Sequence, residues 1–244
     1  MIINYLKRRL NTKQRRKIRK LFVDLTYPVL RYDLSTLAKY CGTDKSGFHE
    51  YTSLYESHFA NLKNKNIKLL EIGIGGYSDP HYGGNSLRMW KNFFSFGIIY
   101  GIDIFDKSEL TEKRIKTFQG DQSDLQFLSR VTNEIGTLDI IIDDGSHKSN
   151  DIINSFNNLF PKLSAGGIYV IEDTLTSYLN SYGGDSLDLD NPKTTMNFFK
   201  KMVDYVNQEE FDKNIIPDGQ NFFSISEIHF YHNIIFVYKS KTPE

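Results

Sequence analysis

Two short, mainly apolar runs rich in β-branched residues constrain the fold of this chain more than any other feature. They cover residues 138–142 and 167–171, and two acidic residues follow each run directly. Apolar runs of this length are typical of strands that are buried on both faces of a parallel sheet. Ligands of open α/β sheets bind outside the carboxyl ends of the strands. We therefore expect one crevice to contain the side chains of Asp144, Glu172 and Asp173.

Three carboxylates that converge in one crevice repel one another unless a cation lies among them. A hard divalent ion such as Mg²⁺ prefers oxygen ligands and fits this set best. His147 lies shortly after Asp144 and is expected at the same end of the sheet. The alternative is that the Asp-Gly and Glu-Asp pairs only begin turns and cap helices. Two such pairs at the ends of successive strands favour the metal site.

Composition limits the class of protein. A chain of 244 residues with 39% hydrophobic and 14% aromatic residues is long and apolar enough to bury a full core. Its single cysteine, Cys41, excludes an intramolecular disulfide and agrees with a reducing compartment. No apolar run approaches the roughly 20 residues of a membrane-spanning helix, and the basic N-terminus lacks the apolar stretch of a signal peptide. We therefore expect a cytoplasmic protein.

The formal net charge of zero hides an uneven distribution. Residues 1–20 contain nine of the 30 Lys and Arg residues and no acidic residue. Such an arm could make a peripheral contact with anionic lipid, or it could pack as a helix against a sister subunit. We favour the packed helix and expect a homo-oligomer. The chain lacks the aromatic interleaving of a nucleic-acid binder, so we expect no nucleic-acid partner.

Strand-like and helix-like patterns alternate from residue 67 onward, as in a doubly wound α/β sheet. The expected strands cover residues 67–72, 98–104, 115–118, 138–143 and 167–172. The expected helices cover residues 86–94, 125–135, 151–159 and 194–206.

The remaining segments complete this organisation. Residues 174–192 are expected to form a long loop over the carboxyl edge of the sheet, which is typical of a functional lid. Residues 222–231 and 234–239 are expected to form a terminal antiparallel hairpin. The order predicts a Rossmann-like sheet of the class I methyltransferase type over residues 61–244, preceded by an N-terminal helical arm and cap over residues 1–60.

A glycine-rich turn follows the first expected strand. It contains Gly73, Gly75 and Gly76, which let the backbone approach a ligand closely. The third glycine of the dinucleotide pattern is missing, and Glu71 stands at the turn, where it would repel a pyrophosphate but attract the amino group of S-adenosylmethionine. These two details favour S-adenosylmethionine over a nicotinamide cofactor.

Two further acids follow the next strands. Asp103 ends the second strand and is expected to accept hydrogen bonds from both ribose hydroxyls, at a spacing later than that of dinucleotide folds. Asp121 follows Gly120 after the third strand and is expected to meet the adenine amine. The alternative for each acid is an ordinary helix cap.

The chain resembles the metal-dependent sugar O-methyltransferases of macrolide biosynthesis, from about Leu37 to Lys239. The resemblance rests on many motifs that occur in order. They are Gly42–Lys45, Tyr51, Tyr55, Glu71–Tyr77, Gly83–Trp90, Gly101–Ile104, Gln119–Asp124, Asp143–His147, Ile171–Thr174, Thr176–Tyr178, Tyr182–Gly184 and Ile228–Tyr231.

The resemblance implies a role for each matching residue. Asp144, Glu172 and Asp173 are implied to bind Mg²⁺, and His147 is implied to be the general base. Residues implied to contact S-adenosylmethionine are Ser86, Asp103, Asp121, Asp143 and the Gly73–Gly76 turn. The lid departs from the pattern at Leu175 and Leu179, and residues 1–30 match nothing in it, so the acceptor is the least determined part.

The expected function is Mg²⁺-dependent methyl transfer from S-adenosylmethionine to a sugar hydroxyl, in bacterial polysaccharide or glycoside biosynthesis. The acceptor would be a small molecule or a glycan. Two alternatives stay open: a methyltransferase for a phosphate-type or other small-molecule acceptor, and a non-catalytic partner protein that binds S-adenosylmethionine. A nicotinamide-dependent sugar oxidoreductase is disfavoured, because no Tyr-x-x-x-Lys pair follows the fourth strand.

Overall fold

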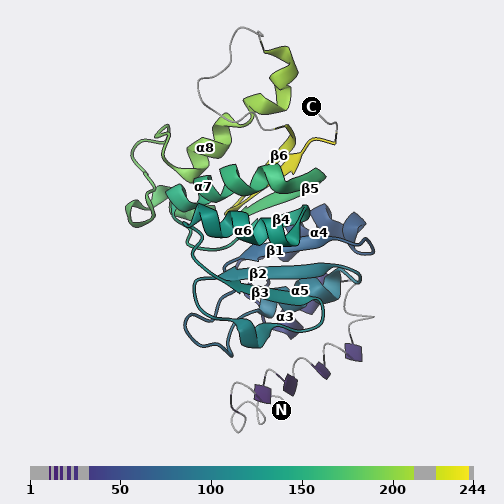
Figure 1. Cartoon of the computed structure of the whole chain (residues 1–244). Helices are drawn as coiled ribbons and strands as arrows, with labels where there is room; N and C mark the ends of the chain where they lie inside the picture. Colours follow the sequence, from purple (N-terminus) through teal and green to yellow (C-terminus); the bar gives the residue numbers. More distant parts are fainter. Residues whose placement is uncertain are drawn as a thin grey trace. The chain divides into compact units, whose positions relative to one another are not determined.

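A computed structural model of the chain describes residues 33–211 and 224–241, and also residues 11, 14–15, 17–18, 21–22 and 25–26 (Figure 1). Most of the basic residues of the N-terminal arm lie outside the described residues, as does the expected strand start at 222–223. No helix among the described residues is long and apolar enough to cross a membrane.

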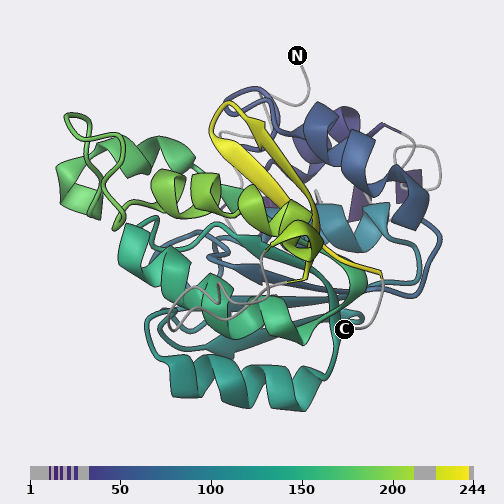
Figure 2. The ribbon, with the colours of Figure 1, turned by 90° about the horizontal axis from the view of Figure 1, so that it is seen from above.

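The described residues contain seven strands, in the order β3-β2-β1-β4-β5-β7-β6. Their bounds are β1 Lys68–Ile72, β2 Ile98–Asp103, β3 Ile115–Gln119, β4 Leu138–Asp143, β5 Leu163–Glu172, β6 Ile225–Tyr231 and β7 Ile234–Lys239. β2 pairs with β3, β1 with β4 and β4 with β5 in parallel, whereas β7 is antiparallel to both β5 and β6. The predicted alternation and the terminal hairpin, which is the yellow ribbon in Figure 2, are confirmed.

One strand begins earlier than predicted. β5 starts at Leu163 instead of residue 167, because Leu163 pairs with Leu138 across a register shift that precedes the regular pairing of Ile140 with Ile168. The residues between are Ser164, Ala165 and two glycines, so their apolar character alone does not reveal the strand.

The helices agree closely with the expected segments. Their bounds are α3 Leu34–Cys41, α4 Thr52–Phe59, α5 Asn85–Phe93, α6 Leu125–Ile135, α7 Ser149–Leu159 and α8 Thr195–Lys201. The prediction of a single helix over 194–206 is wrong in its second half. α8 ends at Lys201, and a separate 3-10 segment, η6 Asp204–Glu210, follows it. α3 ends at Gly42, which takes φ 78° and caps the helix.

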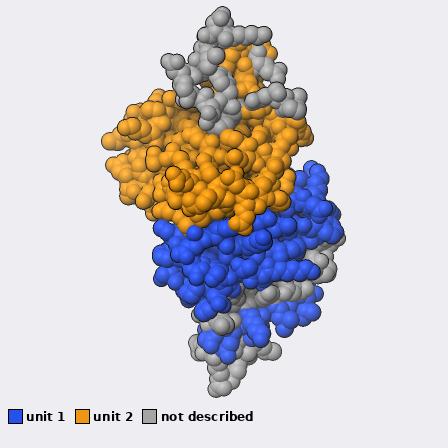
Figure 3. Space-filling view, in the orientation of Figure 1, with its two compact units in different colours: residues 1–67, 74–119 blue, residues 68–73, 120–244 orange. Residues whose placement is uncertain are grey.

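Two compact units make up the chain: residues 1–67 with 74–119, and residues 68–73 with 120–244 (Figure 3). The core of the first unit is aromatic. Trp90 on α5 contacts Tyr55 and Phe59 on α4 and the adjoining Phe94, with ring centroids 4.9, 5.9 and 6.2 Å away. Residues before the sheet therefore form part of the packed core of this unit.

The second unit has its own aromatic core around Phe156 on α7. This ring packs against Tyr169 on β5 and Phe199 on α8, with centroid distances of 5.0 Å in both cases. α6 and α7 lie beside each other, as Figure 2 shows, and α7 also contacts α8. This packing supports β5 from one face.

We expect Phe59→Ala to destabilise the protein by about 3–5 kcal/mol, because truncation of a buried aromatic side chain leaves a cavity. Phe59 is fully buried, whereas Phe96 is 60% exposed. The matched variant Phe96→Ala should therefore change the free energy of unfolding by no more than about 0.5 kcal/mol. Urea denaturation measures both, and equal effects of the two substitutions would contradict the packing of α4 on α5.

Candidate active site

Acidic residues meet at the carboxyl ends of β4 and β5 in the second unit. The two strands pair with Asp143 opposite Ile171, so the chain leaves both strands at the same level. One ligand atom each of Asp144, His147 and Asp173 lies within 4.8 Å of the others. Nε2 of His147 is 3.8 Å from Oδ2 of Asp173. Four residues were expected here, three as metal ligands and His147 as the base. The structure brings three of the four together, namely Asp144, His147 and Asp173.

The backbone at this edge is strained. His147 has φ 58° and Asp173 has φ 52°, and both are non-glycine residues in the left-handed region. Such conformations cost about 1–3 kcal/mol each and persist only where the surrounding structure holds them. Two of the three clustered residues are therefore held in conformations that a free chain would avoid.

Two glycines allow the close approach of the segments that form this edge. A Cβ at Gly73, directly after β1, would collide with the backbone carbonyl of Asp144, and one at Gly145 would collide with Oε1 of Gln122. The amide of Asp144 also donates to the carbonyl of Ile72, at 2.9 Å. The segment after β4 therefore lies tightly against the end of β1.

Glu172 is placed differently from Asp144 and Asp173. It is the last residue of β5, pairs with Ile234 of β7 and is buried, and it is not among the clustered ligand atoms. Its role as a metal ligand stays a prediction. Glu71, near the end of β1, is fully buried.

Asp143 is buried, and its carboxylate faces the interior of the second unit. Its oxygens accept from Nε2 of Gln122, at 2.7 and 2.9 Å, and Oδ2 also accepts from the Tyr169 hydroxyl at 3.2 Å. Burial raises the pKa of Asp143 to about 7, although both hydrogen bonds act in the opposite direction. Burial likewise raises the pKa of the Tyr169 hydroxyl well above its usual value. The predicted contact of Asp143 with a cofactor stays untested, and its observed partners belong to the protein.

The glycine turn of the first unit combines close approach with open space. A Cβ at Gly76 would collide with the carbonyl of Tyr82, and one at Gly83 would collide with that of Gly75. By contrast, a Cβ at Gly75 would meet no atom within 4 Å. The turn is therefore folded back on itself, while the Gly75 backbone faces open space.

The acid that ends β2 lies beside this turn. Oδ2 of Asp103 accepts from the amide of Ile74 at 3.2 Å, and Oδ1 accepts from the amide of Phe105 at 2.9 Å. Ser86 is buried in the first turn of α5. Each Asp103 oxygen retains a second lone pair for a further donor.

Lys107, which was not predicted from the sequence, connects the far end of the same turn to the segment after β2. Its ammonium group donates to the carbonyls of Tyr77, Asp79 and Tyr82 at 2.6, 2.7 and 3.0 Å. The side chain is buried, and burial lowers the pKa of this amine while Asp103 and Asp79 act in the opposite direction. No sequence pattern signals it, because its acceptors are backbone carbonyls far along the chain.

The segment after β3 belongs to the second unit. Asp121 is exposed, and Oδ1 accepts from both the amide and the hydroxyl of Ser123 at 2.8 Å. These hydrogen bonds hold the pKa of Asp121 below its usual value. Gly120 is required here, since a Cβ would collide with the ring of Phe127.

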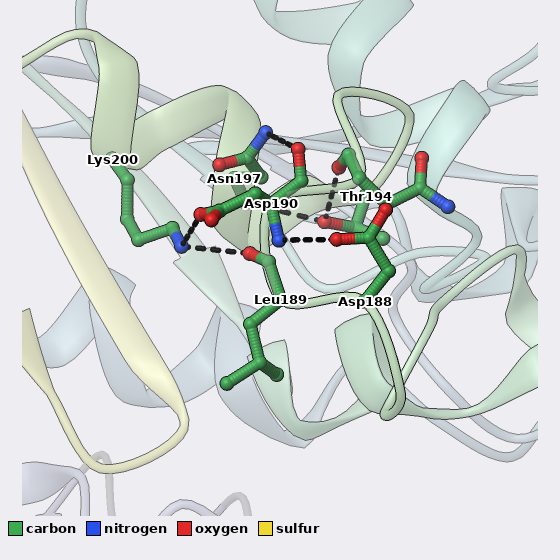
Figure 4. A network of polar contacts seen from close by, with 7 residues as sticks. Asp188, Leu189, Asp190, Thr194, Asn197 and Lys200 are labelled. Atoms are coloured by element: carbon green, nitrogen blue, oxygen red, sulfur yellow. Dashed lines mark hydrogen bonds and ion pairs between the residues drawn. The ribbon is translucent and has the colours of Figure 1, made fainter.

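The expected lid is more ordered than a simple loop. It contains two 3-10 segments, η4 Thr174–Tyr178 and η5 Asn180–Tyr182. Its distal part is bound to α8: Asn197 donates to the carbonyl of Asp190 at 2.8 Å, and Lys200 donates to that of Leu189 at 2.8 Å (Figure 4). Leu175 and Leu179, where the lid departs from the family pattern, are both exposed.

No family model matches the chain. Mycinamicin VI 2''-O-methyltransferase from Micromonospora griseorubida is 44% identical over 215 residues, which cover 87% of this chain and 54% of that protein. The 8-demethyl-8-alpha-L-rhamnosyl tetracenomycin-C 2'-O-methyltransferase from Streptomyces olivaceus is 43% identical and covers 84% and 54%. The chain therefore spans about half the length of the curated relatives it matches.

A solved structure agrees with these similarities. The methyltransferase from the mycinamycin biosynthetic pathway, in complex with Mg and SAH, superposes with a TM-score of 0.81 at 45% identity, over 85% of this chain and 54% of that one. The predicted class I methyltransferase fold is thereby confirmed.

We expect Lys107→Met to loosen the glycine turn, because three carbonyls lose a charged donor. Each buried group left unsatisfied costs roughly 1–3 kcal/mol. Hydrogen–deuterium exchange in residues 77–82 should become faster, while the matched variant Lys116→Met, on an exposed position of β3, should behave as wild type. Unchanged exchange in Lys107→Met would contradict the role of this amine.

Proposed function

We propose that this chain, which belongs to the same family as these sugar O-methyltransferases, transfers a methyl group from S-adenosylmethionine to a sugar hydroxyl in a Mg²⁺-dependent reaction. The observation that carries the proposal is the convergence of Asp144, His147 and Asp173 at the ends of two paired strands. The family premise rests on 41–44% identity to four such enzymes over most of this chain.

The donor set fits a hard divalent cation. Asp144 and Asp173 offer carboxylate oxygens close together, which suits Mg²⁺ and would be repulsive without a cation. We propose that these two residues hold the ion and that Glu172 completes the set. Mg²⁺ bound there would supply Lewis acidity, which makes a hydroxyl easier to deprotonate.

His147 is proposed as the general base. Its Nε2 atom would take the proton of the acceptor hydroxyl, a task that histidine performs more often than any other side chain. Asp173 Oδ2, 3.8 Å from that nitrogen, would stabilise the imidazolium that forms. The alternative is that a carboxylate of Asp144 or Asp143 takes the proton and His147 only orients it.

We propose two sets of cofactor-binding residues. The open side of Gly75 with Gly76, Ser86 and the spare lone pairs of Asp103 fit a ribose and its attached chain. Glu71, Gly73, Gly120, Asp121 and Asp143 are proposed as further cofactor-binding residues. So many acids suit a cationic ligand better than a pyrophosphate. Bound S-adenosylmethionine would supply an electrophilic methyl group.

The acceptor is proposed as a sugar in bacterial polysaccharide or glycoside biosynthesis, since two of the similar enzymes are named for acceptors that carry a rhamnosyl or an olivosyl group. Incubation with methyl-labelled S-adenosylmethionine and a panel of nucleotide-sugars, glycosides and glycans tests this. Transfer to a hydroxyl supports the proposal. Transfer only to a phosphate-bearing oxygen favours the phosphate-type alternative, and cofactor binding without any transfer favours the non-catalytic partner.

Four proposals concern the chain as a whole. We propose that the protein is cytoplasmic and that it is a homo-oligomer. We also propose that residues 1–60 form an arm and cap on a methyltransferase domain over residues 61–244. Analytical ultracentrifugation tests the oligomer, with a single monomeric species contradicting it. The fourth proposal, which we favour less, is that the basic arm makes a peripheral contact with lipid. It predicts that the protein co-sediments with anionic vesicles but not with neutral ones.

Removal of the metal should abolish methyl transfer. We expect turnover to stop in chelator and to return with excess Mg²⁺, because the proposed mechanism needs a cation among the carboxylates. Binding of S-adenosylhomocysteine, measured by calorimetry in the same buffers, is the control and should persist. Full turnover by protein with verified nil metal content would rule out the metal mechanism.

His147→Ala should lower kcat by about 10²–10⁴-fold, the usual contribution of a positioned base. Affinity for S-adenosylhomocysteine should change little. The matched variant His232→Ala, in the exposed turn of the terminal hairpin, should keep wild-type turnover. The contrary result is that His147→Ala retains most of its turnover and that its activity still falls at low pH as in wild type. The role of base would then pass to Asp144 or Asp143.

A further inference from the structure

We infer that Gln122 is a positioning residue that holds the segment Asp144–His147 in its working conformation. The inference rests on the proposed function, because the importance of that segment comes from its roles as ligand and base. Gln122 lies directly after Asp121, at the start of the connection between β3 and α6. It would therefore tie the proposed adenine-binding segment to the catalytic one.

The side-chain amide of Gln122 has one possible orientation. Its Nε2 atom donates to both oxygens of Asp143, at 2.7 and 2.9 Å, and its Oε1 atom accepts from the amide of Ser146 at 2.9 Å. A backbone N–H only donates, so the atom that faces Ser146 must be Oε1, whatever the protonation state of Asp143. The Nε2 atom then faces the carboxyl group of Asp143. All three contacts thus support the same arrangement.

The contact is tight and shielded from water. Gln122 is 6% exposed, and a Cβ on Gly145 would collide with Oε1 of Gln122. The segment after β4 therefore runs directly over this side chain. Its far end is held separately, since the Ser146 hydroxyl donates to Asp151 Oδ2 on α7 at 2.8 Å.

The hydrogen bond to Ser146 acts where the backbone needs support. The next residue, His147, has φ 58°, which a free chain disfavours by about 1–3 kcal/mol. Without the acceptor of Gln122, the part-buried Ser146 N–H loses its partner and the segment can relax. His147 and Asp144 would then leave the geometry that places their ligand atoms beside Asp173.

The experiment compares Gln122→Met, which keeps the volume but removes both hydrogen-bonding functions, with Gln126→Met, an exposed position on α6. Three quantities are measured: hydrogen–deuterium exchange in residues 144–148, Mn²⁺ affinity by the loss of the free-ion EPR signal, and S-adenosylhomocysteine affinity by calorimetry. We expect Gln122→Met to accelerate the exchange and weaken Mn²⁺ binding by about tenfold each, as loss of a buried hydrogen bond predicts. S-adenosylhomocysteine affinity should stay within about threefold, and Gln126→Met should match wild type.

Wild-type exchange and Mn²⁺ affinity in folded Gln122→Met would overturn the inference, even if its melting temperature falls, because that pattern marks a merely structural residue. If Gln122→Met does not fold, Gln122→Asn decides the question in the same way, since it keeps the amide but withdraws the acceptor from Ser146. Failure of wild-type protein to bind Mn²⁺ and S-adenosylhomocysteine would refute the proposed function, while the exchange measurement would still decide the role of Gln122.

Discussion

The parallel pairing of β4 with β5 is the constraint on which the proposed site depends. Asp143 lies opposite Ile171, so the residues that follow the two strands emerge together at one edge. A slip of one residue would turn every side chain of one strand to the other face. Both strands are buried at nearly every position that pairs, so such a slip would force the side chains of one strand into closely packed space that does not fit them. The hydrophobic core therefore determines the register that brings Asp144 and Asp173 together.

The pairing alone does not hold the site, because two of its residues have strained backbones. His147 and Asp173 both lie in the left-handed region, and free segments would leave it. On the β4 side, the amide of Asp144 binds the end of β1, and the amide of Ser146 binds Gln122. Strain at the proposed ligand and base positions is thus balanced by hydrogen bonds from neighbouring segments, which is typical of preorganised sites.

Sequence patterns predicted the strands, most helices, the glycine turn and the convergence of Asp144, His147 and Asp173, because these depend on local periodicity and on the shared edge of parallel strands. They could not predict where each carboxylate points. Asp143 accepts from Gln122 and Tyr169, which lie 21 and 26 residues away along the chain, and no sequence pattern reveals these two partners. Lys107 was missed for the same reason: side chains that bind backbone carbonyls of distant segments leave no sequence pattern.

A crystal structure grown with Mn²⁺ and S-adenosylhomocysteine would test the central claim most directly, with anomalous diffraction recorded at the manganese edge. The account predicts one strong anomalous peak beside the carboxylates of Asp144 and Asp173, with His147 close to it. If S-adenosylhomocysteine is bound but the peak is absent or lies elsewhere, a metal-dependent site at the ends of β4 and β5 is contradicted.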